Sequence, residues 1–265
     1  MTKGRINMQE TDERYSEKVL SLALDLGKSM VRSGAEMNRV EDTVIRIGYA
    51  YGMKKTEVFS IISVIYATVI DSEGKTQSQL RRISSMSVNF EKLEKLNDLS
   101  RRICKNKPDP DEARQELESI CVPGKKFNII VCLGYMLGSA SFTVFFGGTL
   151  LDAVASMPIA AMIYLMQSFI KTQGTSRLFF TALESAAAGL SALLFVHFGF
   201  GNNADMIMIG DIMLLIPGLM LINSLREMLC GDMMSGLLRM LESVLVAMAI
   251  AVGFALPILF WDYIV

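Results

Sequence analysis

The sequence predicts an α-helical membrane protein with five transmembrane helices preceded by a small cytosolic α/β domain. Two observations support this: charged residues are concentrated before residue 127, and long apolar segments follow. Of the 26 basic and 27 acidic side chains, only four and eight lie after residue 126. We therefore expect a cytosolic domain over 1–126 and a transmembrane domain over 127–265.

Composition also argues against several classes of protein. The net charge of −1 averages two unlike halves, and no Lys/Arg cluster with interleaved aromatic residues predicts a nucleic-acid partner. The charged first 30 residues lack the apolar core of a cleavable secretory signal, so we expect a cytosolic N-terminus. The four cysteines are Cys104, Cys121, Cys132 and Cys230, and they lack metal-ligand spacing, so we expect no metal or cofactor. We interpret them as reduced packing residues, with a disulfide or metal site as the alternative.

The charged part combines helical and strand patterns. Apolar residues at helical spacing predict helices over 15–32 and 37–51, the second ending near Gly52. The β-branched run "VFSIISVIYATVI" is too long for one strand, and Gly74 suits a hairpin turn before "TQSQLRRI", so two or three strands are expected. "NFEKLEKLNDLSRRI" predicts a third helix, and a fourth begins with Asp109 as N-cap and Pro110 at the first position.

This domain shows no catalytic constellation. It has no histidine, no glycine-rich phosphate loop and no Gly-x-Ser-x-Gly elbow. Glu36, Arg39 and Glu41 lie on the charged side of the second helix, either as a solvated face, which we favour, or as a ligand or interface patch. The chain is therefore not expected to be an enzyme.

Five apolar segments follow, each close to the ~20 residues that cross the hydrocarbon core: 127–147, 149–170, 178–200, 204–226 and 237–260. The basic residues of this part cluster at alternate connections, while "FFGGT", "GFGNNAD" and "WDYIV" contain no Lys or Arg. The positive-inside rule then predicts a multi-pass protein of the inner (cytoplasmic) membrane, with the N-terminal domain cytosolic and the C-terminus external.

Small residues predict close helix contacts. Gly134 and Gly138 form a Gly-x-x-x-Gly in the first segment, and Ser185, Gly189 and Ala192 form a stripe in the third. We expect a packed bundle.

The fourth segment contains groups that hydrocarbon rejects. At about 1.5 Å per residue from Ala204, Asp211 lies about 10 Å and Pro217 about 20 Å into the segment. Pro217 and Gly218 break the helix, and freed carbonyl groups are tolerated only where protein or a wet cavity satisfies them. Asp211 and Gly218 are seven residues apart, so we expect the acid and the break to face one interior cavity, as in a transporter site. The alternative is a structural kink with Asp211 near the membrane interface.

Other polar residues accompany the break. Glu184 lies about 10 Å into the third segment, whereas Asp152 stands near the start of the second and is more easily read as an interfacial acid. Asn223, Arg226 and Glu227 share a helix face. Asp232, Arg239 and Glu242 surround the last cytosolic turn, as gate salt bridges or as ordinary snorkelling charges.

Three stretches resemble the threonine/serine exporter family: "SGAEMNRVEDTVIRIGYAYG", "GSASFTVFFGGTLLDAVAS" and "LLIPGLMLINSLREMLCGDMMSGLLRMLES". Full-length members of that family have a cytosolic domain and two sets of about five spans. The chain resembles the large subunit of the split two-component form, similar to the succinate exporter type, whose small membrane-protein partner supplies the other spans.

The resemblance implies a subunit of a secondary transporter that exports a small polar metabolite, either a threonine/serine-type amino acid or a dicarboxylate such as succinate. We expect alternating access with proton coupling in a lipid bilayer, and self-association remains open. The positions that match the family's motifs give six candidate residues: Asp152, Pro217, Gly218, Asn223, Arg226 and Asp232. The physical argument adds Asp211 and Glu184. Arg226 could hold a carboxylate, which both substrate classes carry. The alternative is a membrane-anchored enzyme or a regulatory subunit acting through its cytosolic domain.

Overall fold

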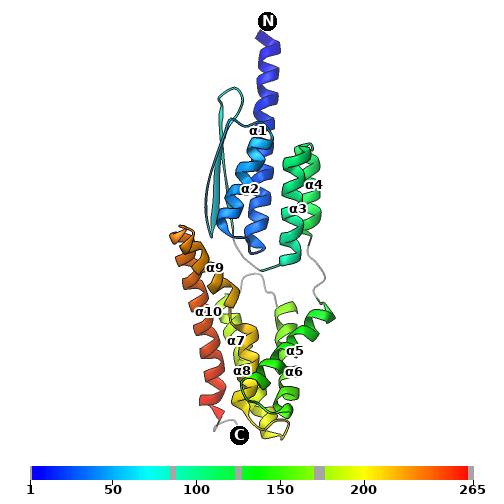
Figure 1. Ribbon diagram of the computed structural model, residues 1–265, viewed down its shortest axis with the longest axis vertical. Coiled ribbons are helices and arrows are strands. Elements are labelled where there is room, and N and C mark those ends of the chain that lie inside the picture. The colour runs from blue at the N-terminus through cyan, green and yellow to red at the C-terminus, as the bar shows by residue number, and fades with distance from the viewer. Residues whose placement is uncertain (1, 84–87, 123–126, 170–176, 262–265) are drawn as a thin grey trace. The chain divides into compact units, whose positions relative to one another are not determined.

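The computed structural model describes residues 2–83, 88–122, 127–169 and 177–261. These ranges form ten helices and one three-stranded sheet (Figure 1). The chain divides into two compact units: unit 1 comprises Met1–Val122 and Asn223–Arg239, and unit 2 comprises Pro123–Ile222 and Met240–Val265.

Unit 1 contains the four helices expected from its apolar periodicity: α1 (Thr2–Arg32), α2 (Met37–Ala50), α3 (Phe90–Asn106) and α4 (Pro110–Cys121). Gly52 follows α2 at φ 85°, a conformation that glycine adopts without strain. The Asp109 side chain accepts a hydrogen bond from the Asp111 amide, with Pro110 in the first turn, as predicted. The start of α1 differs from the prediction, because the helix extends back to Thr2 through a charged sequence.

Three strands follow α2: β1 (Lys55–Ile61), β2 (Val64–Ile70) and β3 (Thr76–Arg82). They form an antiparallel sheet in the order β1-β2-β3, in which Phe59 pairs with Tyr66 and Tyr66 with Leu80. The long β-branched run is therefore a hairpin of two strands, and Gly74, at φ 86°, lies in the next turn. Alternate residues of β2 are buried, so one face of the sheet packs on the core.

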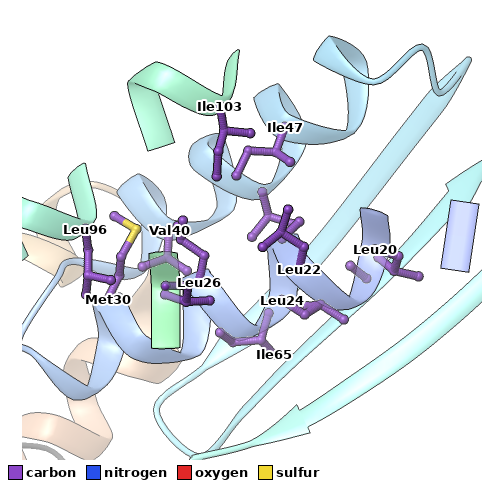
Figure 2. Close-up of a cluster of buried hydrophobic side chains, with 14 of the residues drawn as sticks. Leu20, Leu22, Leu24, Leu26, Met30, Val40, Ile47, Ile65, Leu96 and Ile103 are labelled. Carbon is purple, nitrogen blue, oxygen red and sulfur yellow. The ribbon is translucent and has the colours of Figure 1, made fainter. Parts of the chain in front are cut away.

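The core of unit 1 lies between this sheet face and the helices (Figure 2). Leu22, Leu26 and Met30 of α1 are almost fully buried, and they meet Val40 and Ile47 of α2 in one cluster. A fully buried aliphatic side chain contributes roughly 1.5–3 kcal/mol. This region thus has its own hydrophobic core.

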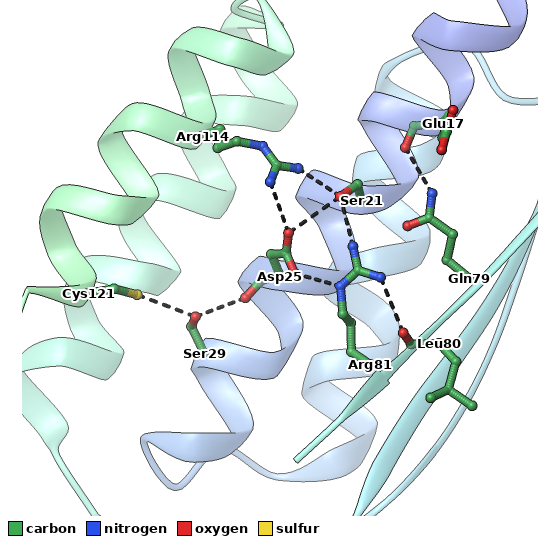
Figure 3. A network of polar contacts seen from close by, with 9 residues as sticks. All are labelled: Glu17, Ser21, Asp25, Ser29, Gln79, Leu80, Arg81, Arg114 and Cys121. Carbon is green, nitrogen blue, oxygen red and sulfur yellow. Dashed lines mark hydrogen bonds and ion pairs between the residues drawn. The ribbon is translucent and has the colours of Figure 1, made fainter. Parts of the chain in front are cut away.

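A polar network joins three elements of unit 1 at the edge of that core (Figure 3). Asp25 of α1 accepts hydrogen bonds from Arg81 Nε of β3, at 2.6 Å, and from Arg114 Nη1 of α4, at 3.2 Å. Both guanidinium groups also donate to Ser21 Oγ, each at 2.8 Å. Because these groups are only partly exposed, the network fixes α4 and β3 on α1 more effectively than a surface ion pair would.

The charged side of α2 is only partly the solvated face that we favoured, since Arg39 is exposed but Glu36 and Glu41 are partly buried. Glu41 Oε1 accepts hydrogen bonds from the backbone amide and hydroxyl of Ser60 in β1, at 2.7 and 2.9 Å. Glu36 forms an ion pair with Arg226. Both acids are thus engaged by residues distant in sequence, which helical periodicity alone does not reveal.

Unit 2 is built from α5 (Ile129–Phe145), α6 (Leu150–Phe169), α7 (Arg177–His197), α8 (Ala204–Leu215) and parts of α9 (Gly218–Leu229) and α10 (Met233–Leu259). Three helices in the described part of the chain are long and apolar enough to cross a membrane: Leu150–Ser168, Arg177–His197 and Met233–Leu259. Helices α8 and α9 are a bent pair that would make a fourth span. Helix α5 is apolar but has only 17 residues, fewer than the ~20 expected of a span, so the fifth is not established.

Close helix contacts in unit 2 occur at glycines other than the predicted pair. Nothing lies within 4 Å of a Cβ built on Gly134, and Gly138 meets only Leu214 Cδ2, at 3.4 Å. A Cβ on Gly210 of α8 would instead lie 2.1 Å from Thr143 Oγ1 and 2.8 Å from Ser139 O in α5. The glycine that permits close approach is therefore in α8, which the spacing in α5 did not indicate.

The small-residue stripe of α7 is buried as predicted. Ser185 and Ala192 have no exposed surface, and a Cβ on Gly189 would lie 3.1 Å from Phe254 Cδ1 in α10. These small residues allow α10 to pack closely on α7.

Candidate functional site

The proline breaks the helix where the sequence placed the break. Helix α8 ends at Leu215, α9 begins at Gly218, and the two are bent by 47°. Ile216 has φ −58° and ψ 127°, the extended conformation that a following proline favours. The Gly218 amide donates to Ile216 O, and Pro217 O accepts from the Leu221 amide at the start of α9.

Asp211 is fully buried in α8 beside α5. Its Oδ1 accepts a hydrogen bond of 2.6 Å from Ser139 Oγ. No described residue bonds its Oδ2. Gly210 allows this contact, since it brings the α8 backbone against Ser139 and Thr143. A buried carboxyl group with an unused oxygen is costly, so the group is a site candidate.

Within the described residues, no cavity shared by Asp211 and the break is found in this conformation. Asp211 has no exposed surface, whereas no atom lies within 4 Å of a Cβ built on Gly218, and Pro217 is partly exposed. The expectation of a shared face required a continuous helix, and the 47° bend rotates α9 away from the register of α8. A cavity of about 330 Å³ lies in unit 1, between α2 and α3.

Glu184 is a second buried acid within unit 2. It is 2% exposed, its Oε1 has no hydrogen-bond partner among the described residues, and the side chain of Gln167 in α6 interacts with it. Gln167 Oε1 in turn accepts a hydrogen bond of 2.9 Å from the Tyr135 hydroxyl of α5. Three helices thus meet at a polar cluster, Tyr135–Gln167–Glu184, inside an apolar bundle.

Asp152 is fully buried and hydrogen-bonded through both carboxylate oxygens. Its Oδ2 accepts from the Thr149 amide and hydroxyl, at 2.9 and 2.7 Å. Its Oδ1 accepts from the amides of Asn202 and Asn203, at 2.6 and 3.0 Å. Thr149 and Asp152 form a capping box at the start of α6 that also fixes the loop before α8. These hydrogen bonds give Asp152 a positioning role at the start of α6, which the sequence did not indicate.

The remaining candidates lie in unit 1, where the α9–α10 hairpin meets the start of α2. Arg226 Nη1 lies 2.6 Å from Glu36 Oε1, so its charge is already paired. Asp232 is partly buried, and its Oδ2 has no hydrogen-bond partner among the described residues. Asn223 is partly buried in α9, one helical turn before Glu227.

A buried ion pair that we had not selected completes this cluster. Glu227 Oε1 and Arg239 Nη1 are 3.2 Å apart, and both side chains are 2% exposed. The Met37 amide of α2 interacts with the same carboxylate. Arg239 is not a snorkelling charge. The sequence did contain a signal for this pair, because Glu227 and Arg239 are an acid and a base in apolar helices on either side of a Gly-Asp turn.

The structure thus divides the predicted residues into two groups. Asp211, Glu184 and Asp152 lie in unit 2 with Pro217 and Gly218, while Asn223, Arg226 and Asp232 belong to unit 1. No three His, Cys, Asp or Glu residues within the described ranges form a potential metal site.

Comparison with known proteins gives a consistent result. Residues 21–261 match the family model described as "Putative threonine/serine exporter". The threonine/serine exporter of Corynebacterium glutamicum is 24% identical over 94% of this chain and 52% of its own length. The "Probable threonine/serine exporter" of Mycobacterium tuberculosis is 22% identical over 91% of this chain and 46% of its own length, so the chain spans about half of these relatives.

Shorter relatives match over nearly their whole length. The "Probable succinate transporter subunit YjjP" of Escherichia coli is 24% identical over 92% of this chain and 94% of its own length. No solved structure matches the chain. The family and these relatives are transporters rather than enzymes, and the apolar helices identify a membrane protein. The chain belongs to the threonine/serine exporter family.

Proposed function

We propose that the chain is a subunit of a secondary transporter that exports a small polar metabolite by alternating access, coupled to protons. The observation that carries the proposal is Asp211, a carboxyl group without exposed surface that uses one oxygen and leaves the other without a partner among the described residues. An unpaired charge buried among apolar helices is costly, so Asp211 would hold a proton in this closed conformation. It would release that proton when the helices open to water.

Glu184 is the second protonatable group in this proposal. The Tyr135–Gln167–Glu184 cluster links α5, α6 and α7, so a change in the charge of Glu184 would alter the packing of three helices. Coupling between sites requires an element with two arrangements, and the α8–α9 break offers the hinge. Pro217 and Gly218 act in this proposal by bending, not by touching substrate.

The proposed topology keeps five crossings in residues 127–265, with α5 as the shortest and α8–α9 as one broken span. A cytosolic domain over 1–126, an external C-terminus and a place in the inner membrane follow from the charge distribution and the positive-inside rule. The match over 94% of a relative named a transporter subunit supports a small membrane-protein partner that supplies further helices.

The proposed substrate is a threonine/serine-type amino acid or a dicarboxylate such as succinate, as the relatives' names suggest. The buried groups of unit 2 favour the first class. Asp211, Glu184, Ser185 and Ser139 offer carboxyl and hydroxyl groups, whereas Arg177 lies at the exposed start of α7 and pairs with Glu242. Once the helices open and these acids release their protons, their carboxylates would attract an ammonium group and repel a second carboxylate.

Counterflow of labelled serine, threonine and succinate into proteoliposomes tests the proposal, with the chain reconstituted alone and with its small partner. We expect flux that requires both chains and that Asp211→Asn reduces at least tenfold. Asp205→Asn, an exposed acid on the same helix, is the matched control and should keep full flux. Equal flux in both variants would remove Asp211 from the mechanism. An enzymatic role would give no flux in any reconstitution, and a purely regulatory role would give flux from the small partner alone.

A further inference from the structure

The outer face of the sheet in unit 1 has an apolar row that none of the described elements of unit 1 is seen to cover. Phe59, Tyr66 and Leu80 are paired across β1, β2 and β3, and they are 62%, 43% and 55% exposed. The opposite face packs on α1 and α2. Large side chains aligned on an exposed sheet face differ from scattered surface apolar residues, which need no explanation.

We propose that this face is a contact surface between two copies of the chain. The charges around the apolar row favour a second copy over other occupants. Glu57 lies in the row before it, on β1, and Arg82 in the row after it, on β3, so opposite charges occupy diagonally opposite corners. A two-fold axis that lies in the interface, passes through Tyr66 and is perpendicular to the Glu57–Arg82 diagonal places Glu57 of each copy opposite Arg82 of the other.

This arrangement is self-complementary, as an isologous interface must be. An anionic lipid surface would instead favour a face of one positive sign, and this face carries Glu57 beside Lys55. The Lys55–Glu57 pair is solvent-exposed in the single chain, and such pairs contribute little, so Glu57 remains available to a partner copy.

The size of the face sets the strength of the contact. Three strands of seven residues cover about 14 Å by 23 Å, which is smaller than the ~800 Å² that each partner of a standard interface buries. The contact therefore depends on confinement of both copies to one membrane, which raises their effective concentration. It should form in membranes and dissociate on dilution in detergent.

Cross-linking in membranes tests the proposal without requiring transport. Residues near a two-fold axis meet their own counterparts, so Tyr66→Cys should give a covalent dimer with a short bismaleimide. The test uses the full chain with its native cysteines replaced. Glu118→Cys, exposed on α4, is the matched control for random collisions. We expect at least fivefold more dimer from the Tyr66→Cys chain.

Charge exchange supplies a second criterion. In the Tyr66→Cys background, Glu57→Arg should reduce the dimer severalfold, and adding Arg82→Glu should restore it. Leu80→Asp should also abolish cross-linking, whereas Phe90→Asp, which alters an equally exposed apolar residue on α3, should not. Dimer yields equal to the Glu118→Cys control, or indifferent to Leu80→Asp, would overturn the proposal. The proposal would also be overturned if the small partner shielded Tyr66→Cys from the cross-linker and no dimer of the chain formed.

Discussion

The close contact between α8 and α5 can be tested by adding one methyl group. Gly210→Ala introduces a Cβ that would lie 2.1 Å from Thr143 Oγ1, 2.8 Å from Ser139 O and 3.1 Å from Thr143 N. A hydroxyl can rotate away, but two of these atoms belong to the α5 backbone. The helices must therefore separate, and the Ser139–Asp211 hydrogen bond must lengthen with them.

The expected cost follows from overpacking, about 1–3 kcal/mol. Alanine is favoured over glycine inside a helix by about 1 kcal/mol, which partly offsets this cost. Gly134→Ala in α5 receives the same propensity gain without a steric cost, because nothing lies within 4 Å of its added Cβ. The difference between the two variants therefore isolates the steric effect.

Thermal unfolding of the purified full chain in detergent measures this difference. We expect the apparent Tm of Gly210→Ala to lie about 2–12 °C below that of Gly134→Ala, from about 1–3 kcal/mol at about 2–4 °C per kcal/mol. Thr143→Ala removes the 2.1 Å contact and should restore part of the loss, since Ser139 O stays in place. A Gly210→Ala variant as stable as Gly134→Ala would refute the packing of α8 on α5.

Three further predictions concern the other sites. Arg239→Leu leaves Glu227 buried without its cation and should cost about 3–5 kcal/mol of stability. The double variant Glu227→Leu/Arg239→Leu should recover most of that stability, and equal Tm values for the single and double variants would contradict a buried pair. Asp152→Asn removes a charged acceptor from the amides of Asn202 and Asn203 and should cost about 1.5–3 kcal/mol of stability. Amide hydrogen exchange at 199–203 should become faster, and unchanged exchange would mean that Asp152 does not hold this loop. Burial is the main cause that raises the pKa of Tyr51 to about 12, and the neighbouring Tyr15 and Asp109 add to it. The Tyr51 hydroxyl donates a hydrogen bond to Pro108 O. The folded pKa exceeds the ordinary value near 10, so this stabilisation is present below pH 10 and lost as pH rises towards 12. Tyr51→Phe should reduce the decrease in Tm between pH 10 and 12. An unchanged decrease would mean that another group causes it.

Local patterns predicted most of unit 1. Helical spacing located α2 and α3, Asp109 and Pro110 marked the start of α4, and the turn glycine separated β2 from β3. These signals act within a few residues of the chain, so a single sequence contains them. The start of α1 was not predicted because residues 2–14, more than three helical turns, carry no apolar stripe.

Contacts between distant segments were much less predictable. The sequence placed Asp211 inside a span but did not reveal Ser139 as its partner, 72 residues away. The sequence did not reveal the hydrogen bonds of Asp152, because two of the donors are the backbone amides of Asn202 and Asn203, which no side-chain pattern indicates. The shared cavity was inferred from the geometry of an unbroken helix, which Pro217 itself invalidates.

The central claim is that proton exchange at the buried Asp211 carboxyl drives export. The most direct test measures proton movement during substrate efflux from proteoliposomes containing both subunits, using a pH-sensitive dye enclosed with the substrate. Because protons would enter as substrate leaves, the lumen should acidify in fixed proportion to efflux. Asp211→Asn should abolish both fluxes, and Asp205→Asn should preserve them. Substrate efflux that continues in Asp211→Asn with its proton flux intact would contradict the account.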